Sequence, residues 1–160
     1  MDFTVSEKVQ TILGMVDEFV KKELLPLEPD FFSKPLAEID PILEEKREMV
    51  KQMGLWAPGH PEELGGMGLG LVELGLVSEA LGRSPLGHFV FGCQAPDAGN
   101  VEILHQYGTA EQKERWLRPL VAGEIRSCFS MTEPEMPGSN PVMMATTAVA
   151  DGDDWVINGQ

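Results

Sequence analysis

The segment 125–141, IRSCFSMTEPEMPGSNP, carries the residue types of an anion-binding loop. Its first part favours a β-strand, and three prolines then stiffen the loop that follows. The turn 138–140 is small and rich in donors, so its backbone N–H groups could bind a phosphate, and Thr132 adds a hydroxyl at the end of the strand. The same residue types are also typical of an ordinary strand and turn without a ligand. The residues alone leave both interpretations open.

A second candidate is a row of small residues. Gly92, Ala95 and Gly99 are spaced so that all three would share one face of a helix and leave that face without side-chain bulk. Such a face could accept a neighbouring helix or the apolar tail of a ligand. The spacing by itself favours close helix packing.

Other residue groups indicate no site. The glycines between 65 and 70 do not match GxGxxG and no GxxxxGK follows, so we expect a loop between helices. His60, His88 and His105 share no metal-ligand spacing with Asp, Glu or Cys, and we expect surface or capping residues and no metal site.

Predicted helices must position both candidate sites, the 125–141 loop and the row of small residues. Apolar residues at steps of three and four predict a helix over about 6–25, which Pro26 and Pro29 end. A second helix is predicted from Asp40, with Pro41 at its first position, to Gly54. Its charged run 44–48 should form the solvated side, and its buried residues should be Ile42, Leu43, Met49, Val50 and Met53.

The next segments alternate between loop and helix. The Gly- and Pro-rich stretch 54–70 is predicted to be a loop that Leu55 and Trp56 pin to the core. The helix predicted over 71–81 is apolar around most of its circumference, which favours a buried central helix. The helical stretch 86–107 should be interrupted at Pro96.

The last predicted helix opens with a capping box, Thr109 with Gln112, and ends near Gly123. It should bury Trp116, Leu117, Leu120 and Val121. Three segments beyond it favour strands: 125–131, 143–150 and 155–157. A run of helices followed by strands predicts a mainly α fold with two units, which we place at 1–123 and 124–160.

Composition limits the function classes. The 160 residues carry a formal net charge of -14, which makes nucleic acid an unlikely class of partner. No signal peptide and no apolar run of about 18 residues is visible, so no membrane span is expected. Cys93 and Cys128 lack a CxxC or Cys/His pattern and predict buried thiols in a reducing intracellular compartment, with a structural disulfide as the lesser alternative.

Three stretches of the sequence together resemble the acyl-CoA dehydrogenase family. They are GLWAPGHPEELGGMGLG, then APDAGNVEILHQYGTAEQKERWLRPLVAGEIRSCF, and CFSMTEP followed by GSN and DGDDWVING. The similarity covers nearly the whole chain and is closest to the branch whose eukaryotic members carry an extra kinase-like domain. It implies the N-terminal helical-bundle domain of that fold, followed by the first strands of an incomplete middle β domain.

The resemblance also implies an FAD site. The strand from Phe129 to Thr132 would lie along the flavin ring, with main-chain groups near Met131 and the Thr132 hydroxyl bonding its pyrimidine edge. Gly138 and Ser139 fall where small residues of the family meet the pyrophosphate. The family loop reads TEPxxGSD, whereas this loop is one residue longer and has Asn140 in place of the acid.

The helix around Phe91 to Gly99, including Gly92 and Ala95, would by the same resemblance lie beside the acyl tail of an acyl-CoA substrate. A bare groove there would suit a long or bulky acyl chain. The family's base is a Glu of a C-terminal helical domain, so none of these residues is assigned that role. The implied activity is α,β-dehydrogenation in fatty acid metabolism by a homo-oligomer, in a bacterial-type cytoplasm or a similar compartment. An electron-transfer flavoprotein or similar acceptor would take the electrons.

The chain ends in DGDDWVINGQ, where Asn158 and Gly159 have the form of a type I′ hairpin turn. A turn without a return strand predicts a chain that stops inside the β domain. By the resemblance, the isolated fragment would then lack the family's C-terminal catalytic domain and half of the flavin site, so it should be inactive and bind FAD weakly. A second class stays open: a non-catalytic binding or assembly module with the same fold.

Overall fold

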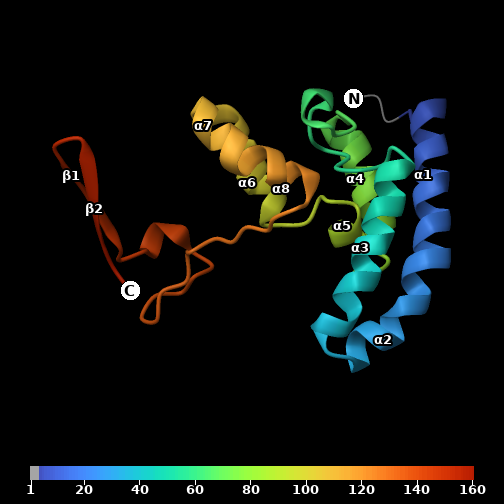
Figure 1. Ribbon diagram of the computed structural model, residues 1–160, viewed down its shortest axis with the longest axis horizontal. Coiled ribbons are helices and arrows are strands. Elements are labelled where there is room, and N and C mark those ends of the chain that lie inside the picture. Colours follow the sequence, from blue (N-terminus) through green and yellow to red (C-terminus); the bar gives the residue numbers. More distant parts are fainter. Residues whose placement is uncertain (1–3) are drawn as a thin grey trace. The chain divides into compact units, whose positions relative to one another are not determined.

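The computed structural model describes residues 4–160 (Figure 1). The chain forms two compact units, one that ends at Ser127 and one over Cys128–Gln160. The first is helical, and the second contains one two-stranded sheet. This confirms the predicted fold class of a mainly α chain followed by the first strands of a β domain. The domain boundary after Gly123 stays a prediction.

The first helical stretch is α1 (Glu7–Phe19), which the Ser6 side chain caps by accepting a hydrogen bond from the Val9 N–H. It continues as a π-helical turn (Val20–Leu24), a 3₁₀ turn (Leu25–Leu27) and α2 (Glu28–Ser33). Pro26 and Pro29 therefore do not end the helical path, contrary to our expectation. Each lies in the first turn of the next segment, where its missing N–H costs no bond.

The second predicted helix, α3 (Leu36–Gln52), starts before Asp40, so Pro41 lies inside it. The earlier start buries Ile39, which is 1% exposed, and this apolar burial offsets the cost of an interior proline. Arg47 is buried, so the charged run is not wholly solvated as predicted. Met53 is exposed rather than buried.

Leu55 and Trp56 are buried, which confirms that they pin the loop 54–70. The helix α4 (Leu71–Leu81) has the predicted bounds. It is not a central helix buried on all sides, because the Leu71 and Val72 side chains are 87% and 53% exposed. Its second half alone contributes to the core.

The stretch 86–107 is interrupted as predicted, by a cis peptide bond between Ala95 and Pro96 that separates α5 (Gly87–Val90) from α6 (Asp97–Tyr107). The Thr109–Gln112 capping box is present and opens α7 (Ala110–Gln112). A π-helical turn (Lys113–Leu117) and α8 (Arg118–Ala122) follow. The wider π turn changes the helical register, so Trp116 is 41% exposed and not buried as predicted.

Two groups of apolar side chains form the interior of the helical unit. The larger joins α1, α3, α4, α5 and the loop that holds Trp56, and α1 packs along α4 in Figure 1. The smaller joins α6 to α8 through Val101, Leu117, Leu120 and Val121.

The second unit contains a 3₁₀ turn (Pro141–Met143) and the antiparallel strands β1 (Thr147–Asp151) and β2 (Asp154–Asn158). Thr147 pairs with Asn158, and the hairpin turns at Gly152, where φ is +62°. The predicted strand 125–131 does not form, and the predicted 143–150 strand begins only at Thr147. Asn158 ends β2, and the turn predicted at 158–159 after this strand stays a prediction.

Three smaller expectations have clear outcomes. His60 is buried rather than exposed, and burial lowers its pKa, partly opposed by Glu102. Both cysteines are free thiols, but Cys128 is exposed while burial raises the pKa of Cys93 to about 12. Among residues 4–160, no helix is long and apolar enough to cross a bilayer.

Candidate functional site

The 128–132 segment presents unused backbone groups. It belongs to no helix or strand, its Phe129 side chain is 53% exposed, and Thr132 is exposed at its end. Within the part of the chain that the structure describes, no backbone hydrogen bond uses the N–H or C=O groups of residues 129–131. A row of free donors and acceptors beside a hydroxyl is what a heterocycle edge with alternating carbonyl and N–H groups requires.

The loop after this segment is closed by Glu133. The Glu133 carboxylate is buried and accepts hydrogen bonds from the backbone N–H groups of Ala145 and Thr146, both at 2.7 Å. A bridge to Met136 closes the intervening turn. The hydrogen bond from Thr146 to the side chain and then the two backbone N–H groups lower the pKa of Glu133. A carboxylate held in this way is a weak base and a structural tie.

We expect the amide proton shifts of Ala145 and Thr146 to titrate with a midpoint below 4.5, the ordinary pKa of a Glu side chain. Because the pKa is lowered in the folded state, the tie is complete above pH 4.5 and is lost as the pH falls through the lowered value. NMR spectra of the chain between pH 3 and 7 measure this. Glu133→Gln should abolish the titration, and a midpoint above 4.5 would contradict the tie.

The turn at Gly138 and Ser139 lies against Thr132. The Asn140 N–H bonds the Pro137 carbonyl at 3.1 Å, so the turn is closed. A Cβ built on Gly138 would lie 2.5 Å from Thr132 Oγ1, so any larger residue here would force the Thr132 side chain to shift. The Ser139 side chain is exposed. The structure therefore brings together Thr132, Gly138 and Ser139, three of the predicted cofactor residues.

The row of small residues does not form one helical face. Gly92 has φ +66° and lies outside any helix, Ala95 precedes the cis peptide bond, and Gly99 alone is in α6. The preceding helix already ends at Val90, before Gly92, and the next begins only at Asp97, after Pro96. Phe91 is fully buried and packs edge to face on Phe19, with 5.4 Å between ring centroids.

Trp56 fills the space that two glycines leave. A Cβ on Gly92 would lie 2.5 Å from the indole, and one on Gly123 would lie 2.8 Å from it. The indole N–H donates to the Val121 carbonyl at 2.8 Å. Gly92 is therefore explained by packing against Trp56, a loop residue, and not by the close packing of two helices that the spacing favoured.

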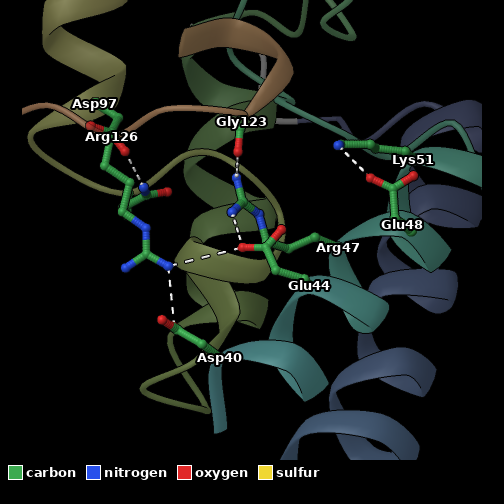
Figure 2. A network of polar contacts seen from close by, with 9 residues as sticks. Asp40, Glu44, Arg47, Glu48, Lys51, Asp97, Gly123 and Arg126 are labelled. Atoms are coloured by element: carbon green, nitrogen blue, oxygen red, sulfur yellow. Dashed lines mark hydrogen bonds and ion pairs between the residues drawn. The ribbon is translucent and has the colours of Figure 1, made fainter. Parts of the chain in front are cut away.

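Arg47 extends this packing into a polar network (Figure 2). Its guanidinium donates to Glu44 at 2.6 Å and to the Gly123 carbonyl at 3.0 Å, and it lies over the Trp56 and Phe89 rings. Sequence reasoning missed this residue. Its spacing from Leu43 and Val50 puts it on the buried face of α3, which was the available signal.

Sequence reasoning also missed a cluster at the start of α6. Asp97 Oδ1 accepts from the Ser127 N–H at 2.7 Å and from the Ser127 hydroxyl at 2.6 Å. Asn100 Nδ2 donates to Ser127 Oγ at 2.8 Å, and Gln94 donates to Asp97 Oδ2. Among residues 4–160, no cluster of His, Cys, Asp and Glu could hold a metal ion.

Comparison with known proteins identifies the fold. Residues 6–124 match the model of the acyl-CoA dehydrogenase N-terminal domain. Acyl-CoA dehydrogenase family member 11 of Gallus gallus is 38% identical, over 99% of this chain and 21% of the relative. A solved candidate acyl-CoA dehydrogenase from Mycobacterium abscessus is 39% identical with a TM-score of 0.84, over 98% of this chain and 42% of that one.

A glutaryl-CoA dehydrogenase from Mycobacterium smegmatis, solved in complex with FADH2, is 30% identical with a TM-score of 0.70, over 97% of this chain and 38% of that one. The chain thus spans about a fifth of the length of the Gallus gallus relative. It spans about two fifths of the solved chains. By its sequence and its fold, the chain belongs to the acyl-CoA dehydrogenase family.

Proposed function

We propose that the protein to which this chain belongs is an FAD-dependent acyl-CoA dehydrogenase, with this chain as its helical domain and the first strands of its β domain. The observation that carries the proposal is the free backbone edge of residues 129–131 beside Thr132, in a chain of this family. A similar protein is solved with FADH2. When bound, FAD supplies the hydride acceptor for oxidation of the Cα–Cβ bond of an acyl-CoA.

The local geometry supports the proposed cofactor roles. The backbone beside Phe129 and Met131 is free to bond the pyrimidine edge of a flavin, and the exposed Thr132 hydroxyl adds one further group. The closed turn at Gly138 and Ser139 offers backbone N–H groups and a hydroxyl to the pyrophosphate. These donors fit FAD because their partners are not supplied by the described chain.

The substrate roles divide into two kinds. Ala95 is exposed and Gly99 is half-buried, so these two are the residues we place beside the acyl tail. Phe91 and Gly92 pack against Phe19 and Trp56 and would support that wall from behind. Because the continuous bare face does not form, our argument for a long or bulky acyl chain loses its structural basis.

We assign the role of catalytic base to no Asp or Glu of this chain. Glu133 is the acid within the flavin motif, and its oxygens already bind two backbone N–H groups. We therefore place the base, as in the family, in a C-terminal helical domain. An electron-transfer flavoprotein or similar acceptor and a homo-oligomeric assembly in a reducing intracellular compartment complete the proposal.

The test uses the complete open reading frame that contains these residues. The purified product should release FAD on denaturation and should reduce an artificial electron acceptor only when an acyl-CoA is added. Butyryl-CoA and palmitoyl-CoA then measure the acyl-length preference. A product without FAD and without acyl-CoA-dependent reduction would contradict the proposal and support an assembly module instead.

A further inference from the structure

Ser127, the last residue of the helical unit, is fixed by side chains of α6. We call the group formed by Asp97, Asn100 and Ser127 the Asp97 clamp. Asp97 accepts two bonds from Ser127, at its N–H and its hydroxyl, and Asn100 donates a third. Gln94 holds the second oxygen of the same carboxylate, so Asp97 cannot turn away without losing a further partner.

The position of Asp97 strengthens these bonds. It is the first residue of α6, where the positive end of the helix dipole favours a carboxylate. Hydrogen bonds to an ionised acceptor are also shorter and stronger than neutral ones. The clamp is therefore a firm attachment of one backbone N–H to one helix end.

Arg126, the neighbouring residue, is held by α3 (Figure 2). Its guanidinium forms ion pairs with Asp40 at 3.3 Å and Glu44 at 3.9 Å and lies 4.5 Å from the Phe89 ring centroid. Two consecutive residues are thus tied to two different helices at the point where the chain leaves the helical unit.

The clamp residues adjoin, along the chain, two functional elements of the proposed enzyme. The helix α6 carries Gly99, which we place beside the acyl tail, and Ser127 directly precedes the 128–132 segment, which we place along the flavin. We propose that Asp97 is a positioning residue for hydride transfer, which fixes Ser127, the residue before the 128–132 segment, to the helix that carries Gly99. This inference rests on the proposed function.

A misplacement of about 1 Å between reacting groups can reduce a rate about a hundredfold. In the complete protein, we expect Asp97→Ala to lower kcat by about 10- to 100-fold, with KM and FAD content within about twofold of the parent. Asp97→Asn keeps an oxygen acceptor but not the charge, so it should restore part of kcat. The shift of the flavin absorbance band when substrate binds should also shrink in Asp97→Ala.

The matched control is Thr109→Ala, which removes the α7 cap from the same helical unit without touching the clamp. It should lower the thermal midpoint and leave kcat unchanged. If Asp97→Ala does not fold, Ser127→Ala carries the test, because it removes the hydroxyl bonds but keeps the backbone N–H bond to Asp97. We expect from it a smaller loss of kcat.

The outcomes separate the two proposals. A parent protein without FAD or activity overturns the proposed function. An active parent whose kcat falls equally in Asp97→Ala and Thr109→Ala, or whose Asp97→Ala variant loses FAD instead of kcat, overturns the positioning role. A loss of kcat confined to the clamp variants, with partial rescue by Asp97→Asn, supports it.

Discussion

Trp56→Ala is expected to lower the free energy of unfolding of the helical unit by about 3–5 kcal/mol, the range for deleting a large buried aromatic side chain. The indole is 7% exposed and packs against Gly92 and Gly123, which have no side chain to occupy its space. Its removal leaves a cavity and also leaves the Val121 carbonyl without its donor. Urea unfolding of the chain, followed by circular dichroism at 222 nm, measures the loss.

Two other variants separate the causes. Trp116→Ala removes the same side chain from an exposed position, where it stacks on Arg115, and should cost less than about 1 kcal/mol. Trp56→Phe keeps most of the ring but not the N–H and should cost about 1–3 kcal/mol. Equal losses in Trp56→Ala and Trp116→Ala would show that Trp56 is not the packing centre described above.

Trp56 has a large expected effect because it connects two groups of apolar side chains. It belongs to the larger core, while its hydrogen bond reaches Val121 in the smaller one. Arg47 makes a parallel connection from α3 to the Gly123 carbonyl. The cluster of α6 to α8 is too small to be stable alone, so its stability depends on these connections.

The features that the sequence predicted correctly are local ones. The bounds of α4, the Thr109–Gln112 capping box and the break at Pro96 each depend on residues a few positions apart. Capping and proline effects act within one helical turn, so a short stretch of sequence contains the information that determines them.

The features that it missed depend on distant residues. Arg47 is buried where it binds the Gly123 carbonyl. That partner lies 76 positions away in the sequence, so the residues near Arg47 do not reveal it. The Gly92 position is explained by Trp56, which comes from a different loop. The predicted strand 125–131 stays unpaired because a strand requires a neighbouring strand, which local sequence does not specify.

The residues of the candidate site divide in the same way, into those that a local motif predicted and those that depend on a distant partner. Motif resemblance identified Thr132, Gly138 and Ser139, and the structure places these three near one another in one loop. Motif resemblance did not identify Asp97, whose partner Ser127 lies 30 positions away in the sequence. The available signal was an acid at the first position of a helix that follows a proline, which also occurs where no such clamp exists.

Gly138→Val is expected to lower the affinity of the complete protein for FAD by about 10- to 100-fold, provided that the proposed function is correct. The new Cβ would lie 2.5 Å from Thr132 Oγ1 and 3.1 Å from Thr132 Cβ, so the Thr132 side chain must move. Thr132 is the residue that we place at the pyrimidine edge, and Ser139 would shift with the turn. Titration of the apoprotein with FAD, followed by quenching of flavin fluorescence, measures the affinity.

The matched control is Gly152→Asn in the turn between β1 and β2. Gly152 has a positive φ, which asparagine tolerates, and no atom lies within 4 Å of a Cβ built there. FAD affinity should therefore be unchanged in Gly152→Asn. Because both variants alter a glycine of the same small unit, a loss confined to Gly138→Val identifies the contact with Thr132 as the cause. An equal loss in both would instead indicate general destabilisation of that unit.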